Sequence, residues 1–175
     1  AADLAWLRER GFEPALRQHV ARGGRVLGIC GGMQMLGGEL RDPAGVDGSA
    51  EGLGFLSLLT TFAEAKLTHR IQGRFASSLD GPWAAMAGLP FDGYEIRHGR
   101  TSADGAKEAL EPDVGWADGP VLGIAPHGLF EQPELVAALL GADPAGSLDQ
   151  ALEDLTDAVV AGLDMELVER LARVA

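Results

Sequence analysis

The segment Arg25-Val-Leu-Gly-Ile-Cys-Gly-Gly-Met-Gln-Met-Leu36 decides the fold of this chain. Its first half is a short apolar run bounded by glycines, which is typical of a buried parallel strand. Gly31 and Gly32 then turn the chain, and Met33 opens a helical pattern. A helix, a buried strand, a tight turn and a second helix in this order predict an α/β domain with a parallel sheet.

The remaining chain continues this alternation without an internal repeat. The helical pattern that precedes the deciding segment ends at the Gly23-Gly24 pair. Ser147, with Gln150 three residues later, forms a capping box for a late helix. We therefore expect helices over 1–10, 13–22, 133–140, from 147 onward and over 165–174, strands over 55–62, 66–75, 93–101 and 121–125, and a loop over 37–54.

Charge and composition exclude several classes of partner. The 175 residues carry a net charge of −12, a poor match for phosphate backbones or anionic lipid, so neither nucleic acid nor a membrane surface is expected as a partner. No apolar stretch approaches the ~18 residues of a membrane span, and no leader pattern opens the chain. The single cysteine excludes an intramolecular disulfide and argues against a metal site built on thiolates. These counts predict a cytoplasmic protein.

Cys30 stands where a strand turns sharply into a helix, with Gly28 two residues before it and Gly32 two residues after it. A nucleophile on such a turn stands clear of both elements, and small neighbours let the backbone bend. The following helix is expected to lower the thiol pKa, and the Gly31 N–H to hold an oxyanion. The alternative is a small apolar filler at the end of a strand. The flanking glycines favour the nucleophile.

His127 is the best candidate for the base that such a nucleophile needs. It follows the strand predicted over 121–125, and ligands of open parallel sheets bind at the carboxyl ends of strands, where Cys30 also lies. Leu129, two residues later, cannot orient an imidazole. Glu131 is the nearest carboxylate and is either a third catalytic member or the start of the helix at Pro133. The unit is therefore a dyad, or a triad completed outside this chain.

At these residues the chain resembles the class I (triad-type) glutamine amidotransferases, whose nucleophile motif is Gly-x-Cys-x-Gly-x-Gln. More narrowly, it is similar to the C-terminal glutaminase domains of the cobyric acid synthase family. The stretch over 93–101 is the most discriminating, because it is not general among glutaminases, and this family lacks a carboxylate at the position of Leu129. The matching stretches are Ala2-Asp-Leu-Ala-Trp-Leu-Arg8, Gly28-Ile-Cys-Gly-Gly-Met-Gln-Met-Leu-Gly37, Glu51-Gly-Leu-Gly54, Gly93-Tyr-Glu-Ile-Arg-His-Gly-Arg-Thr101 and His127-Gly-Leu-Phe-Glu131.

The resemblance implies a flavodoxin-like fold, with a mostly parallel central sheet flanked by helices and its N-terminal part missing. It implies that Cys30 attacks the side-chain amide of glutamine while His127 relays protons. Gly31 would stabilise the oxyanion, and the glutamine pocket would be formed by Gln34 and by the strand that carries His98 and Gly99. For His98, a strand residue that faces solvent is an equal alternative.

The resemblance also implies a larger enzyme. Residues 1–175 would be the glutaminase domain of a longer chain, whose ATP-dependent synthetase domain is absent. Ammonia would pass to that domain and amidate adenosylcobyrinic acid a,c-diamide, a corrinoid, in cobalamin biosynthesis. Without a phosphate-binding loop, no cofactor is expected in this chain, and ATP and Mg²⁺ would belong to the synthetase domain.

Four alternatives remain open at this point. Two stay within the superfamily, namely cobyrinic acid a,c-diamide synthase and the glutaminase subunit of a lipid II amidating complex. The stretches Tyr94-Glu-Ile96 and Arg100-Thr101 favour cobyric acid synthase over both. The third alternative is a non-catalytic interaction domain of the same fold, and the fourth is a cysteine hydrolase of an unrelated substrate.

Overall fold

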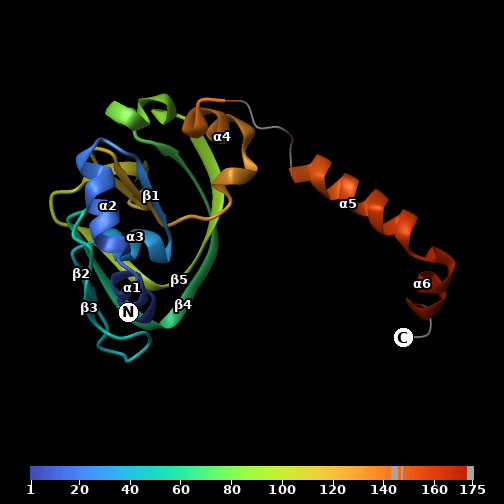
Figure 1. The fold of residues 1–175 in the computed structure, drawn as a ribbon, viewed down its shortest axis with the longest axis horizontal. Coiled ribbons are helices and arrows are strands. Elements are labelled where there is room, and N and C mark those ends of the chain that lie inside the picture. The colour runs from blue at the N-terminus through green and yellow to red at the C-terminus, as the bar shows by residue number, and fades with distance from the viewer. Residues whose placement is uncertain (143–145, 147, 173–175) are drawn as a thin grey trace.

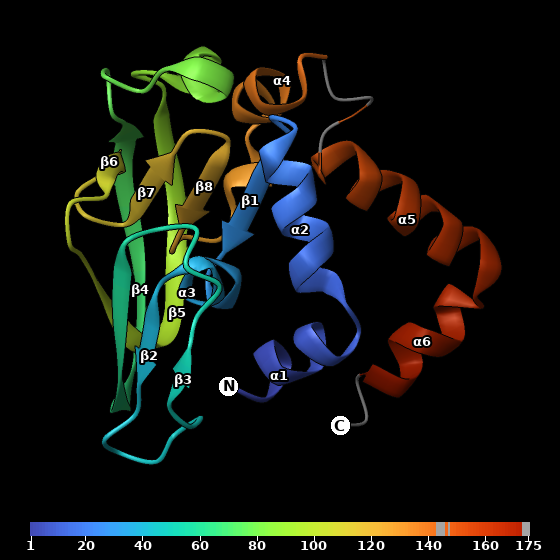
Figure 2. The same ribbon diagram turned by 60° about the vertical axis from the view of Figure 1, so that its left-hand side comes forward.

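The computed structural model describes residues 1–142, 146 and 148–172. Its body is built on one eight-stranded sheet, with α2 alongside β1 and α1 at one end of α2 (Figures 1 and 2). The helices are α1 (Ala2–Glu9), α2 (Phe12–Ala21), α3 (Gly31–Leu36), α4 (Pro133–Leu140), α5 (Leu148–Gly162) and α6 (Met165–Ala172), with short 3-10 turns η1 (Gly81–Met86) and η2 (Leu129–Glu131). The strands are β1 (Val26–Ile29), β2 (Glu39–Arg41), β3 (Ala50–Glu51), β4 (Leu58–Phe75), β5 (Pro90–Ala103), β6 (Lys107–Glu111), β7 (Gly115–Asp118) and β8 (Val121–Ile124).

The sheet confirms the α/β class and the buried strand before Cys30. β1 pairs in parallel with β8, from Val26 opposite Val121 to Ile29 opposite Ile124. The strand order is β1-β8-β7-β6-β4-β2-β3, with β5 paired to β4. The sheet is less parallel than expected, because within the described chain only β1–β8 and β2–β4 are parallel. The short connections that join β6, β7 and β8 permit only antiparallel neighbours, since a parallel pair needs a long crossover.

Two strand predictions merge in the structure. The segments expected over 55–62 and 66–75 form the single strand β4, whose pairing with β5 shifts register between Phe62 and Leu67. The residues at this shift are polar or small and largely exposed, so the apolar pattern breaks although the strand continues. Sequence analysis also missed β6 and β7, and it missed β2 and β3 inside the predicted loop.

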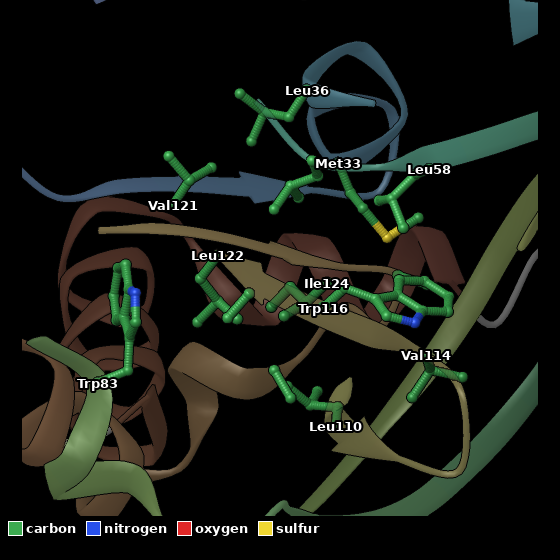
Figure 3. Packing of buried hydrophobic residues seen from close by; sticks show 14 of the residues in the cluster. Met33, Leu36, Leu58, Trp83, Leu110, Val114, Trp116, Val121, Leu122 and Ile124 are labelled. Atoms are coloured by element: carbon green, nitrogen blue, oxygen red, sulfur yellow. The ribbon is translucent and has the colours of Figure 1, made fainter. Parts of the chain in front are cut away.

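The core lies between α3 and the sheet and continues to the far side of β8. Met33 is fully buried, and a Cβ added to Gly123 of β8 would lie 2.7 Å from its Cγ. Figure 3 shows Met33 beside Leu58. The helix that follows Cys30 is therefore held against the strand that precedes His127.

Any side chain at Gly28 is expected to lower the stability of the fold. A Cβ at this position would lie 2.5 Å from Leu36 Cδ1 and 2.8 Å from the backbone carbonyl of Gly32, which cannot move without changing the turn at Cys30. We expect Gly28→Ala to lower the free energy of unfolding by about 1–3 kcal/mol, measured by urea denaturation. Gly162→Ala is the control, because a Cβ there meets nothing within 4 Å. Equal stability of the two variants would show that the turn tolerates the methyl group.

Helices α5 and α6 lie apart from the body, as Figure 1 shows. Their apolar side chains are exposed, with Leu155 at 60 % and Leu171 at 62 %. The expected helices are present, whereas the predicted cap residue Ser147 lies outside the described residues. In the part of the chain that the structure describes, no helix is long and apolar enough to cross a membrane.

Candidate active site

Cys30 occupies a strained turn between β1 and α3. Its backbone has φ 51° and ψ −109°, a conformation that an L residue rarely adopts. Strain of this kind persists only where the surrounding structure imposes it, and it is concentrated at functional sites. The sharp strand-to-helix turn expected around Cys30 is therefore present, and its geometry is that of a nucleophile elbow.

The thiol of Cys30 is half-buried, and its Sγ donates to the carbonyl oxygen of Ile96 at 3.6 Å. Burial raises the pKa of this thiol above its ordinary value, although the Gly31 N–H and the charge of Arg97 act in the opposite direction. The expectation that the helix lowers the thiol pKa is therefore wrong for this structure. Loss of water around the sulfur outweighs the effect of the six-residue helix α3. The thiol needs a base to become a nucleophile at neutral pH.

The raised pKa predicts the pH dependence of alkylation. The thiolate is the reactive form, so iodoacetamide is expected to modify Cys30 more slowly at pH 7 than it modifies an unstructured cysteine peptide. The rate should continue to rise above about pH 8.5, where half of an ordinary cysteine is already ionised. Rates measured by mass spectrometry between pH 6 and 10 test this expectation. The expectation would be contradicted if the alkylation rate of Cys30 levelled off at a pH below the titration midpoint of the peptide.

His127 lies at the same edge of the sheet as Cys30. The Cys30 N–H donates to the Ile124 carbonyl at 2.7 Å, which continues the parallel pairing of β1 and β8 to their carboxyl ends. His127 follows three residues later, at the end of β8. Within the described residues, no hydrogen bond joins the two side chains, because the thiol is directed at Ile96 instead. The two predicted residues are thus brought to neighbouring strand ends.

The strand β5 crosses this edge and contacts both residues. Tyr94 pairs with His127 through two backbone hydrogen bonds and stacks on its ring, whereas the Ile96 carbonyl accepts from Cys30. Sequence analysis used Tyr94 and Ile96 only to discriminate between related families, and it assigned them no role in the site. The available signal was the pair of glycines, Gly93 and Gly128, that flanks the contact.

Gln34 and Gly99 meet, as a shared pocket requires. Gln34 on α3 is 8 % exposed, and a Cβ at Gly99 would lie 2.6 Å from its Nε2. No hydrogen bond reaches the Gln34 amide within residues 1–142, 146 and 148–172. His98, in contrast, places Nδ1 3.3 Å from the Ala63 carbonyl on β4, and it has no recorded contact with Cys30 or Gln34.

A buried charged pair beside the thiol was not anticipated from the sequence. Glu95 is 2 % exposed and accepts from Arg97 Nε at 2.7 Å, and His69 Nε2 lies 3.4 Å from its other oxygen. The Arg97 guanidinium also donates to the Gly99 carbonyl. Both charges are close enough to Cys30 to influence its pKa, in opposite directions. The pair therefore links Gly99 to the surroundings of the Cys30 thiol.

The structure gives His127 no carboxylate partner among the described residues. Leu129 is buried at 7 % exposure in η2, and Glu131 is exposed with no recorded bond to the imidazole. Glu131 lies in the turn before α4, which begins at Pro133, as the helix-start interpretation predicts. No group of three or more His, Cys, Asp or Glu side chains that could hold a metal ion occurs in the described part of the chain.

A strained cysteine between a strand and a helix, with a histidine beyond the end of the neighbouring parallel strand, is the arrangement that the resemblance to glutamine amidotransferases led us to expect. The family described as CobB/CobQ-like glutamine amidotransferase domain matches residues 1–135, so the chain belongs to this family. A cobyric acid synthase of Polaromonas naphthalenivorans (strain CJ2) is 46 % identical over 167 residues, which are 90 % of this chain and 34 % of that protein. One of Paracidovorax citrulli (strain AAC00-1) is 49 % identical over 168 residues, 91 % of this chain and 34 % of that protein.

Solved structures support the same fold. A structure titled "Crystal structure of glutamine amidotransferase" superposes with a TM-score of 0.57 at 24 % identity, covering 79 % of this chain and 71 % of that chain. PurLQS from Thermotoga maritima superposes with a TM-score of 0.53 at 16 % identity, covering 74 % and 66 %. At these identities the likeness concerns the fold alone. The chain spans about a third of the length of the curated relatives it matches.

Proposed function

We propose that this chain is a glutaminase domain that releases ammonia from glutamine through a Cys30 thioester. The observation that carries the proposal is the strained backbone of Cys30 at the elbow, with His127 at the adjacent strand end. Membership in the glutamine amidotransferase family supports glutamine as the substrate. The raised thiol pKa supports a mechanism in which a base takes the proton as the sulfur attacks.

The proposed reaction proceeds in two halves. His127 takes the Cys30 thiol proton while Sγ forms a bond to the side-chain amide carbon of glutamine, and the Gly31 N–H stabilises the resulting oxyanion. The C–N bond then breaks, and ammonia leaves with the proton that His127 returns. In the second half, His127 takes a proton from water, which attacks the thioester. The C–S bond then breaks, His127 returns the proton to Sγ, and glutamate leaves.

The glutamine pocket is proposed to lie between α3 and β5, where the Gln34 amide is buried beside Gly99. The Gln34 amide has no hydrogen-bond partner among the described residues, so it is available to bind a ligand. His98 remains a proposed pocket residue through the backbone of its strand only, since its ring is directed at Ala63. Glu131 is not needed in this mechanism.

Gly99→Ala tests the pocket. The new Cβ would lie 2.6 Å from both Gln34 Nε2 and Thr60 Cγ2, and the Gln34 amide can move more easily than the buried threonine. If the displaced amide costs the enzyme about 1.4 kcal/mol of binding free energy for glutamine, KM for glutamine should rise about tenfold. Gly38→Ala is the control, because its Cβ would meet only a carbonyl oxygen at 3.6 Å. A KM equal to that of the control would remove Gly99 and Gln34 from the pocket.

We further propose that the ammonia is used by an ATP-dependent synthetase domain, as the name cobyric acid synthase of the relatives suggests. On this proposal residues 1–175 form a glutaminase domain, ATP and Mg²⁺ bind the synthetase domain, and the acceptor is adenosylcobyrinic acid a,c-diamide. A cytoplasmic location belongs to the same proposal. Discrimination from cobyrinic acid a,c-diamide synthase requires an assay with each corrinoid acceptor, followed by mass spectrometry of the product.

Labelling with 6-diazo-5-oxo-L-norleucine tests the glutaminase function directly. This glutamine-like electrophile is expected to modify Cys30 stoichiometrically in the full-length protein, and glutamine should protect against it. Cys30 is the single cysteine of these 175 residues, so the labelled peptide is unambiguous. Absence of labelling under conditions that label a known glutaminase would favour a non-catalytic interaction domain. Ammonia release from other amides as well as from glutamine would favour an unrelated cysteine hydrolase.

A further inference from the structure

We propose that Tyr94 is a positioning residue that holds the His127 imidazole in its working orientation, a task that a carboxylate performs in other catalytic triads. The inference rests on the proposed function of His127. It follows from a backbone bridge, a ring contact, two glycines and the surroundings of the imidazole.

The backbone bridge fixes the register between the two residues. The Tyr94 N–H donates to the His127 carbonyl at 3.2 Å, and the His127 N–H donates to the Tyr94 carbonyl at 2.8 Å. Residues that exchange two such bonds in an antiparallel pair project their side chains to the same side. The bridge therefore brings the two rings together without any contribution from other side chains.

The two rings stack with their centroids 5.5 Å apart and an angle of 13° between their planes. Stacked aromatic rings attract one another in addition to the area that they bury. Tyr94 is 39 % exposed, so its ring does little to fill the core, and its recorded ring contact is with His127. The Tyr94 ring, stacked on one face of the His127 imidazole, restricts rotation of the imidazole. It leaves the edges of the imidazole, where both nitrogens lie, open to the thiol and to substrate.

Two glycines make this contact possible. A Cβ on Gly93 would lie 2.4 Å from the His127 carbonyl oxygen, so any larger residue would break the bridge. Gly128 has φ +87°, and a Cβ there would lie 3.4 Å from Tyr94 Cε1. Gly93 is therefore required by the close approach of the two backbones, and Gly128 is favoured by its positive φ.

The surroundings of the imidazole leave the orienting task to Tyr94. Across residues 1–142, 146 and 148–172, no side-chain hydrogen bond or ion pair reaches the His127 ring. The position two residues later holds the apolar side chain of Leu129. Without a carboxylate, the phenol ring of Tyr94 is an aromatic contact placed to restrain the imidazole plane.

Comparison of Tyr94→Leu with Tyr94→Phe in the full-length protein tests the proposal. Tyr94→Leu keeps the backbone bridge but removes the stacked ring, so kcat for glutamine hydrolysis should fall about 10- to 100-fold, the cost of a misplaced catalytic group. KM should change by no more than about threefold, because the group acts on the chemical step. Tyr94→Phe retains the ring and should restore kcat to near the unmodified level.

A second readout follows the imidazole itself. With histidine-selective isotope labelling, the Hα–Hβ couplings of His127 should report one side-chain rotamer in the unmodified protein and in Tyr94→Phe, and averaging between rotamers in Tyr94→Leu. Phe12→Leu is the matched control, since it also removes an exposed ring from a stacked pair, with Trp6 at 5.8 Å on α1. It should change neither kcat nor the couplings.

Each other outcome overturns the proposal in a distinguishable way. A raised KM with unchanged kcat in Tyr94→Leu would make Tyr94 a wall of the substrate pocket. Unaveraged couplings in Tyr94→Leu would show that the ring is not held by stacking, whatever the activity. If His127→Ala hydrolyses glutamine normally, the proposed role of His127 fails instead, and the couplings still decide whether Tyr94 restrains the ring.

Discussion

Cys30→Ser is expected to abolish glutamine hydrolysis while leaving ammonia-dependent amidation by the full-length protein intact. Serine retains the size of the side chain but is a far weaker nucleophile, and the half-buried thiol already depends on a base. Loss of a nucleophile in comparable enzymes removes at least about 10³-fold of the rate. Glutamate formation measures the first activity, and product formation with ammonium chloride measures the second.

The prediction requires glutamine hydrolysis and ammonia-dependent amidation to take place at two separate sites. If Cys30→Ser also lost the ammonia-dependent activity, the glutaminase and the amidation would not be separate reactions. The variant must remain folded for the comparison to count, and circular dichroism or the urea midpoint can show this. Because the φ of 51° at Cys30 is unfavourable for either side chain, the substitution adds no backbone strain.

His127→Ala is expected to reduce glutamine hydrolysis by about 10²- to 10⁴-fold, the range that general acid–base groups contribute. Its loss should slow formation of the thioester, because the thiol with its raised pKa then has no proton acceptor. Rapid-quench measurement of the covalent intermediate separates this step from its hydrolysis.

His19→Ala provides the comparison for this variant. His19 is exposed on α2, and its ring contacts the Arg25 carbonyl at 3.1 Å, before the start of β1 and so at the opposite end of that strand from the elbow. Its substitution should leave hydrolysis within about twofold of the unmodified protein. Near-normal hydrolysis by His127→Ala would remove this residue from the site and leave Cys30 without an identified base.

Much of the candidate site could be predicted because it is encoded locally. The strand, the glycines and the helix around Cys30 are contiguous, so their pattern specifies the elbow, and helix α4 was predicted over the residues it occupies. His127 required one further rule, that parallel strands expose their carboxyl ends at one edge. Family resemblance then named Gln34 and Gly99, which the structure places in contact.

What could not be predicted depends on contacts between distant segments. The raised pKa of Cys30 arises from burial, which the helix-dipole argument omitted. The approach of Tyr94 to His127 depends on where β5 crosses the sheet, and alternation along one strand does not reveal this. The antiparallel strands β6 and β7 were missed because their sequences, Lys-Glu-Ala-Leu-Glu and Gly-Trp-Ala-Asp, lack the continuous apolar run by which the equally short β1 and β8 were predicted.

The irregular stretch where β4 changes register against β5 fixes the offset between the two halves of this strand pair. Upstream of it Phe62 faces Gly99, and downstream Leu67 faces Arg97, so residues 63–66 stand opposite a single residue of β5. One half of the hairpin thus sets Gly99 against Gln34, and the other half sets Tyr94 against His127. A slip of one residue turns every side chain to the opposite face of a strand. Exposed positions in this irregular stretch can therefore change in identity, whereas an insertion or deletion there would separate the substrate pocket from the base.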